Sequence, residues 1–184
     1  QLRAWAQAQW QLELWQARVG SNFKRLQNSY TDITQMGVDR WLAMVAAWEK
    51  YEMALCLINC GTAMTIDVID NEGKHLGGYI IPGIDMMQQA LIENTDKINV
   101  STAQAMSMQP ASDTSHAISH GAYMALIASI EKTLDALMTN YNLDVQCIIS
   151  GGMADLIKSE LKCKVIDEPN IVLAGLSIMH RASG

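Results

Sequence analysis

The sequence lacks basic clusters and long apolar runs. Its 13 Lys and Arg residues are outnumbered by 19 Asp and Glu residues, which gives a formal net charge of -6 at pH 7. This balance argues against electrostatic binding to nucleic acid or to an anionic membrane, and it favours a small-molecule partner. No run reaches the roughly 18 apolar residues that a spanning helix requires, and no signal-peptide pattern opens the chain. These absences predict a soluble, cytoplasmic protein.

Paired cysteine motifs are also absent. Cys56, Cys60, Cys147 and Cys163 occur without any C-x-x-C spacing, and three of them lie in or beside apolar strand-like runs. This pattern favours buried free thiols in a reducing cytosol over disulfides or a metal site. With 184 residues, 49% of them hydrophobic, the chain has room for one domain or two small lobes with a real core.

Several familiar catalytic motifs are missing. The sequence contains no Walker A loop, no G-x-G-x-x-G fingerprint and no nucleophile elbow for Ser/His/Asp hydrolysis. His116 and His120 have a spacing that suits a metal, but no third ligand is recognisable, so a solvated helix surface is favoured. If the chain binds phosphate, it does so in another way.

The pattern that is present consists of a meander followed by alternating strands and helices. We expect strands at 55–59, 64–70, 75–81, 145–150 and 164–166, and helices at 1–18, 39–51, 84–94, 114–141, 153–161 and 170–181. Residues 95–113 read as a polar connection with short helical pieces. A meander followed by strand-helix alternation predicts a mixed α/β domain.

A stripe of small residues runs along one face of the longest predicted helix, 114–141. Gly121, Ala125 and Ser129 recur at every fourth position, on one face of that helix. Small side chains allow another helix to approach closely. The stripe therefore predicts a helix contact, either within the subunit or across a dimer.

Two glycine-containing turns are candidates for anion binding. Gly61-Thr62-Ala63 offers backbone N–H groups and a hydroxyl between two strands, and Ser150-Gly151-Gly152 joins a strand to a helix. Backbone donors and a helix dipole together suit a phosphate. Because glycine is common in hairpins and caps, an ordinary structural interpretation is favoured for Gly61-Thr62-Ala63, whereas for Ser150-Gly151-Gly152 the two interpretations stand level.

Charged residues near these turns also have two interpretations. After Gly37, one interpretation is that Asp39 caps a helix beside a solvated Arg40. A second, which the first does not exclude, is that Asp39 accepts a proton from a substrate hydroxyl while Arg40 holds an anionic group. Asp67, on the strand after the first glycine turn, either holds a water on Mg²⁺ or lines the sheet surface. Local sequence does not choose between these roles.

Five ordered motifs together resemble a known family. "YTDITQMGVDRWLAMVAA", "NCGTAMTIDVID", "HLGGYIIPGIDMM", "DTSHAISHG" and "SGGMADLI", over roughly residues 28–179, are similar to those of type III pantothenate kinase. The resemblance implies an actin-like fold of the acetate and sugar kinase and Hsc70 type, with two ribonuclease-H-like lobes. Residues 1–50 would be the remainder of the N-terminal lobe and 51–184 the C-terminal lobe. It also implies a homodimer that transfers the γ-phosphate of ATP to the primary hydroxyl of pantothenate.

The resemblance assigns roles residue by residue. Asp39 would be the proton acceptor, and Thr62 would contact ATP phosphate. The pantothenate site would comprise Tyr30, Gly37, Val38, Asp39, Arg40 and Thr114. The ATP site would comprise Gly61, Thr62, Gly151 and Gly152. The implied cofactors are ATP, Mg²⁺ and a monovalent cation, K⁺ or NH₄⁺, at the position of Asn59.

Two departures from the family pattern stand out. Asn59 occupies a position where the family has aspartate, which predicts weaker or altered dependence on the monovalent cation. The family also begins with a D-x-G-N-T turn that binds ATP phosphates and Mg²⁺, and we expect that segment to lie upstream of Gln1. A chain of this kind without the first motif also suggests an alternative, a non-catalytic pantothenate- or nucleotide-binding protein that acts as an accessory factor in transcription.

Overall fold

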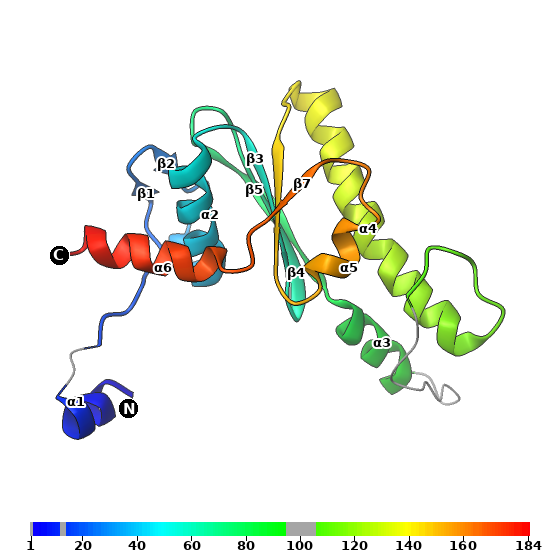
Figure 1. Ribbon diagram of the computed structural model, residues 1–184, viewed down its shortest axis with the longest axis horizontal. Helices are drawn as coiled ribbons and strands as arrows, with labels where there is room; N and C mark the ends of the chain where they lie inside the picture. The colour runs from blue at the N-terminus through cyan, green and yellow to red at the C-terminus, as the bar shows by residue number, and fades with distance from the viewer. Residues whose placement is uncertain (1, 12–13, 95–105) are drawn as a thin grey trace.

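A five-stranded mixed sheet forms the centre of the protein. The computed structural model describes residues 2–11, 14–94 and 106–184, and the sheet order is β5-β4-β3-β6-β7 (Figure 1). The strands are β3 (Leu55–Cys60), β4 (Ala63–Ile69), β5 (His75–Pro82), β6 (Gln146–Ser150) and β7 (Val165–Asp167). β3, β4 and β5 form an antiparallel meander, and β6 and β7 run parallel to β3. The predicted meander and α/β class are confirmed, and this order, with β4 alone reversed, is that of a ribonuclease-H-like lobe.

Helices cover both faces of the sheet. α2 and α6 lie on one side, and α4 lies on the other with α3 and α5 (Figure 1). The helices are α1 (Leu2–Trp10), α2 (Val38–Tyr51), α3 (Ile84–Glu93), α4 (Thr114–Tyr141), α5 (Ala154–Lys158) and α6 (Ile171–Ala182). A short hairpin, β1 (Asn22–Phe23) and β2 (Leu26–Gln27), and a 3-10 helix, η1 (Ile33–Gln35), precede α2. None of the described helices is long and apolar enough to cross a membrane.

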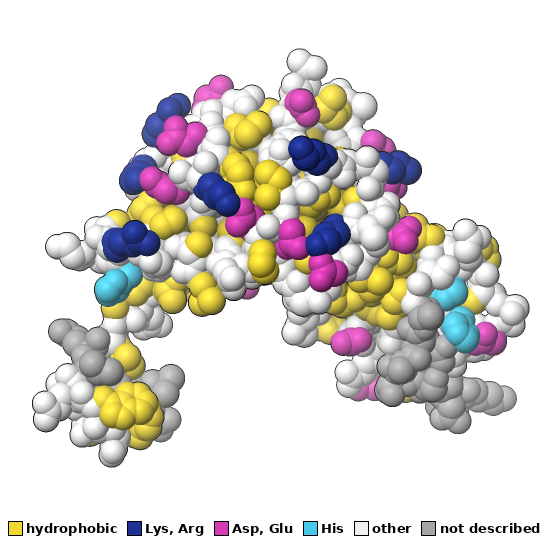
Figure 2. Space-filling model, in the orientation of Figure 1, with side chains coloured by type: hydrophobic (Ala, Val, Ile, Leu, Met, Phe, Trp, Pro, Cys, Tyr) yellow, Lys and Arg dark blue, Asp and Glu magenta, His cyan; other side chains and the backbone are white. Residues whose placement is uncertain are grey.

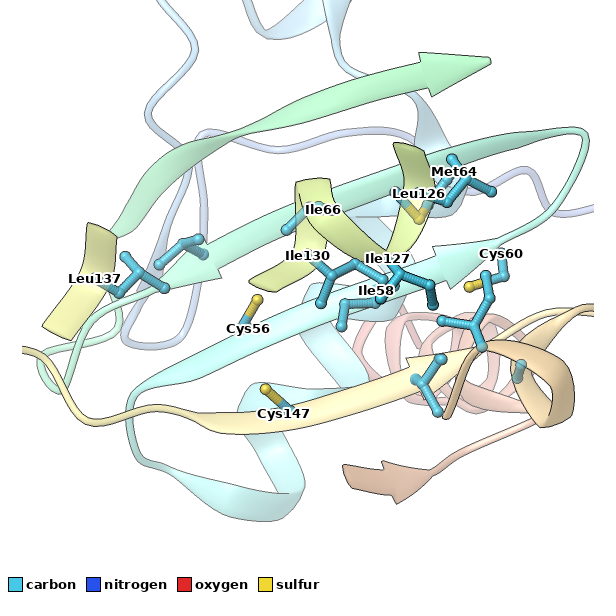
Figure 3. Packing of buried hydrophobic residues seen from close by; sticks show 14 of the residues in the cluster. Cys56, Ile58, Cys60, Met64, Ile66, Leu126, Ile127, Ile130, Leu137 and Cys147 are labelled. Atoms are coloured by element: carbon cyan, nitrogen blue, oxygen red, sulfur yellow. The ribbon is translucent and has the colours of Figure 1, made fainter. Parts of the chain in front are cut away.

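Strand alternation creates two separate hydrophobic cores. On β3, Leu55 and Leu57 pack toward α2, whereas Cys56, Ile58 and Cys60 pack toward α4 (Figure 3). Each fully buried Leu or Ile side chain contributes about 1.5–3 kcal/mol, so a one-residue slip of register would cost both cores at once. α2 closes one of these cores. The domain boundary expected at residue 50, directly before the end of α2, stays a prediction.

The four cysteines are free thiols, as predicted. Burial raises the pKa of Cys60 to about 12. Burial also raises the pKa of Cys163 to about 11, and the Cys163 sulfur lies 3.6 Å from that of Cys147. Because the thiolate is the reactive form, these side chains are inert core and near-core residues at neutral pH.

The predicted N-terminal helix is shorter than expected. α1 ends at Trp10, Gln11 has a left-handed φ of 54°, and residues 14–19 form no helix. Beyond α1, Trp15 contacts the ring of His180 on α6, with ring centroids 5.2 Å apart. In the connection expected over 95–113, residues 95–105 lie outside the described part of the chain, and 106–113 contain no helix.

The surface shown in Figure 2 carries charges of both signs. Lys and Arg side chains lie next to Asp and Glu side chains over the body of the molecule (Figure 2). Among the ion pairs of the structure, Lys158 pairs with both Asp155 and Asp167. On this face, positive charge is therefore compensated locally.

Candidate active site

Most of the predicted site residues lie at one edge of the sheet. β3, β5 and β6 are mutually parallel, so their carboxyl ends meet at this edge. The Gly61-Thr62 turn joins β3 to β4 there, and Gly151 follows β6. Only residues 52–54 separate α2 from β3, so α2 runs back along the sheet (Figure 1). The first turn of α2, which contains Asp39, therefore lies toward the same edge. Loops at the carboxyl ends of parallel strands are the usual ligand sites of α/β proteins.

The glycine turns at this edge pack backbone against backbone. The Gly83 N–H, at the start of α3, donates to the Thr62 carbonyl over 3.0 Å. Gly151 has a φ of +99°, and a Cβ there would lie 2.4 Å from the Cys60 carbonyl oxygen, so only glycine fits. α5 spans Ala154–Lys158, shorter than the predicted 153–161, and its dipole adds little to the anion site expected at Gly151 and Gly152.

The start of α2 presents an exposed carboxylate. Gly37 is the N-cap residue, Asp39 lies in the first turn, and Val38 is 42% exposed. A Cβ at Gly37 would lie 2.6 Å from Asp39 Oδ1, so the missing side chain gives the carboxylate room to fold back over the helix end. Negative charge is favoured there by the unpaired N–H groups of the first turn. The Asp39 carboxylate is thus accessible to a ligand at this edge.

Arg40, the next residue, points into the protein instead of into solvent. Its Nε donates to Asp67 Oδ2 over 2.9 Å and its Nη2 donates to Asp67 Oδ1 over 2.5 Å. Its Nη1 donates to the Tyr30 hydroxyl oxygen over 2.8 Å, and its Cζ lies 5.6 Å from the centre of the Tyr30 ring. Arg40 and Asp67 are only 4% and 3% exposed. The guanidinium is therefore fixed in a bidentate ion pair.

His75 completes this buried network. Its Nε2 lies 3.0 Å from Asp67 Oδ1, its Nδ1 lies 3.1 Å from Ser29 Oγ, and its ring stacks on Tyr30. Burial would raise the pKa of Asp67, but the hydrogen bonds from His75 and Arg40 outweigh burial and hold that pKa below its usual range. Burial opposes the charge of Arg40 too, yet the pKa of Arg40 is raised by its bonds to Asp67. Both members of the ion pair are charged.

Two expectations from the sequence are corrected by this geometry. Arg40 is not solvated, and Asp67 does not line the sheet surface, because both side chains are buried and paired with each other. The sequence analysis assigned no role to His75, whereas the structure buries it completely. The available signal was an aspartate inside an otherwise apolar strand, since a buried charge needs a partner.

A row of polar side chains crosses the sheet beside the network. Asn59 pairs in register with Thr65 on β4 and with Ser150 on β6. Strand alternation puts these three on the face that α2 covers, because Leu57 and Ile148, two positions before Asn59 and Ser150, belong to the α2 core. The predicted cation position is thus surrounded by neutral oxygen-bearing side chains.

Thr114 lies apart from the other substrate-site candidates. It begins α4 on the opposite side of the sheet from α2 (Figure 1). There it lines a groove of about 470 Å³ between α3 and α4, together with Met87, Leu91 and Gly121. A single chain therefore does not bring Thr114 and Asp39 together.

The histidine pair on α4 forms local contacts. His116 Nδ1 lies 2.7 Å from Asp113 Oδ2, and His120 Nδ1 lies 2.7 Å from the Gln109 carbonyl oxygen. Within the described residues, no group of three or more His, Cys, Asp or Glu side chains could hold a metal ion. Both histidines are partly exposed, in agreement with the surface position predicted for them.

Comparison with known proteins identifies the family. A family model described as type III pantothenate kinase matches residues 1–136. The chain belongs to the type III pantothenate kinase family. It is 36% identical over 182 residues to the type III pantothenate kinase of Nitrosococcus oceani, covering 96% of this chain and 68% of that protein. It is 40% identical over 166 residues to that of Hahella chejuensis, covering 90% and 67%.

A solved structure shares the fold. The structure of a protein described as a Baf family transcriptional activator from Campylobacter jejuni aligns with 83% of this chain and 67% of its own, with a TM-score of 0.58 and 21% identity. This likeness concerns the fold alone. Membership of the type III pantothenate kinase family makes the chain a kinase whose class uses ATP to phosphorylate pantothenate, the reaction that the motifs implied.

Proposed function

We propose that this chain carries out the family reaction with Asp39 as the proton acceptor for the primary hydroxyl of pantothenate. The observation that supports this most is the exposed Asp39 carboxylate, which lies directly before the fixed Arg40 at the carboxyl edge of the sheet. Phosphoryl transfer passes through a loose transition state, so positioning and charge neutralisation dominate. A carboxylate held at a helix start suits this role without being strongly basic.

The substrates would meet at that edge from two directions. Tyr30, Gly37, Val38 and Arg40 would line the pantothenate side around Asp39. Backbone N–H groups and the Thr62 hydroxyl in the exposed Gly61-Thr62 turn would contact the ATP phosphates, with Gly151 and Gly152 beside them. Such backbone donors bind anions without needing basic side chains.

Mg²⁺ would enter with the nucleotide. The described residues offer no group of three or more metal-binding side chains, and Asp67 is already paired with Arg40. Mg²⁺ is commonly held by substrate phosphates and only one or two carboxylates, so such a group is not required for an ATP-bound ion. Among the described residues, we therefore assign no set of protein ligands to Mg²⁺.

The monovalent cation would lie near Asn59. Side-chain oxygens of Asn59, Thr65 and Ser150 are suitable ligands by type, but they carry no negative charge. We expect K⁺ to activate the wild type weakly and the Asn59→Asp variant about 3-fold or more, since a carboxylate attracts the cation more strongly. Initial rates across a KCl series test this, with choline chloride as the ionic-strength control. Equal K⁺ activation of both proteins would contradict the assignment.

The exposed α4 surface and the position of Thr114 support a homodimer. If Thr114 contacts pantothenate, it reaches the Asp39 site of a second copy, because the two residues lie on opposite sides of the sheet in one chain. The small-residue stripe on α4 lies on the part-exposed face of that helix, where it would allow a close approach.

Mixed dimers test this arrangement. Co-expressed Asp39→Asn and Thr114→Ala chains, purified through two different tags, would contain one intact site per heterodimer. At low pantothenate concentration we expect this heterodimer to turn over faster than either parent homodimer. No gain over the parents, or a monomer in sedimentation, would contradict the shared site.

The function itself is tested by ADP release from the full-length gene product with ATP and Mg²⁺, with and without pantothenate. Pantothenate-dependent turnover is the expected result. A folded protein that binds pantothenate without turning it over would instead support the non-catalytic alternative. The free thiols of the cysteines also support the proposed cytoplasmic location, because they suit a reducing compartment.

A further inference from the structure

The buried contacts behind Arg40 extend the candidate site beyond the residues that the family motifs assign. Asp67 lies 27 positions after Arg40 in the chain, on β4, and His75 lies at the start of β5. The register of β4 with β5 and the packing of α2 on the sheet bring the three together. The network therefore links three structural elements to one side chain of the substrate pocket.

The direction of each hydrogen bond in this network follows from its chemistry. An ionised Asp67 only accepts, so the His75 Nε2 that lies 3.0 Å from it carries a proton and donates. A hydrogen bond between His75 Nδ1 and Ser29 Oγ, at 3.1 Å, then fixes the plane of the imidazole. The ring in this plane stacks on Tyr30, with centroids 6.1 Å apart and an interplanar angle of 22°.

Some of the N–H donors of Arg40 also have identified partners. A guanidinium has five N–H groups, and bonds to Asp67 and Tyr30 engage three of them. A Cβ at Gly78 would lie 2.8 Å from Asp67 Oδ1 and 3.0 Å from Arg40 Nη2, so the glycine leaves the space that the ion pair occupies. The Arg40 guanidinium is thus held in a fixed orientation, with its charge balanced by Asp67.

We propose that Asp67 and His75 are positioning residues of the pantothenate pocket, which hold the Arg40 guanidinium and the Tyr30 ring in the orientation that receives the substrate. This inference rests on the proposed function. His75 touches no substrate itself but fixes Tyr30 by stacking and Asp67 by a hydrogen bond. Losing that hydrogen bond lets Asp67 and Arg40 shift, and small displacements of positioning groups have large effects on reaction rates.

A matched pair of substitutions isolates the hydrogen bond. His75→Phe keeps an aromatic ring beside Tyr30 but removes the donor to Asp67, whereas His75→Gln keeps an N–H donor near the Nε2 position. We expect His75→Phe to raise the KM for pantothenate about 10-fold, with less change in kcat and in the KM for ATP, and His75→Gln to recover most of that loss. Calorimetric binding of pantothenate should show the same order.

Two further variants separate positioning from simple destabilisation. Leu137→Ala, in the α4 core near the far end of that helix, should lower stability without changing either KM. Tyr30→Phe removes the hydroxyl that Arg40 binds, and its effect on KM should not add to that of His75→Phe, since both act through Arg40. Ser29→Ala, which removes only the outer bond to His75, provides a milder perturbation if His75→Phe does not fold.

The outcomes are distinguishable. If the wild type is active, an unchanged KM for pantothenate in folded His75→Phe would overturn the positioning role alone. If His75→Phe does not fold, an unchanged KM in Ser29→Ala would overturn it in the same way. A wild type without pantothenate-dependent turnover would overturn the proposed function and this inference with it. A selective rise in that KM, recovered by glutamine, would support both.

Discussion

Replacing Asp39 with asparagine is expected to reduce kcat by about 10²–10⁴-fold, the usual contribution of a general base. The amide side chain of this variant could still accept a hydrogen bond from the substrate hydroxyl but could not take its proton. Asparagine is also well tolerated near a helix start, and Asp39 is exposed, so the fold should survive. The measurement is steady-state ADP release, with the KM for both substrates determined in parallel.

The matched control is Asp144→Asn. Asp144 is also an exposed aspartate, but it precedes β6 and lies at the opposite edge of the sheet. Its substitution makes the same chemical change away from the site and should leave kcat within about 2-fold, as expected for a surface substitution. If Asp39→Asn turned over substrate as fast as the wild type, the proposal that Asp39 is the proton acceptor would be wrong.

Replacing Asp67 with asparagine is expected to lower the free energy of unfolding by about 3–5 kcal/mol at pH 7, because it leaves the buried Arg40 charge without its partner. Urea unfolding followed by circular dichroism measures this loss. Asp155→Asn is the control. It removes a carboxylate from an ion pair in which the Asp155 side chain is 87% exposed, and it should cost less than about 1 kcal/mol.

This loss of stability should depend on pH in a defined direction. The pKa of Asp67 is lower in the folded protein than in the unfolded chain, so its contribution is present above the ordinary pKa of about 3.9 and is lost as the pH falls through the folded value. The difference between wild type and Asp67→Asn should therefore be largest near neutral pH and shrink below about pH 4. A difference that stays constant down to acid pH would argue for lost packing instead of a lost charge.

Much of the architecture could be predicted from local patterns. The helix expected at 39–51 is α2, which buries the apolar side chains of Trp41, Met44, Val45 and Trp48. The strand-like runs that became β3, β4 and β5, separated by turn residues, predicted the meander. The five ordered motifs predicted the family that the comparisons then identified.

The tertiary structure alone decided what surrounds the candidate base. Local sequence treated Arg40 and Asp67 separately, as a helix-start side chain and a strand side chain, because their pairing spans 27 residues. The Arg40–Asp67 pair forms only when α2 packs on the sheet. Likewise, the placement of Thr114 across the sheet from Asp39 depends on the order of strands and the path of α4. Helices and strands follow from interactions between near neighbours in the chain, whereas buried charges find partners only when distant segments pack together.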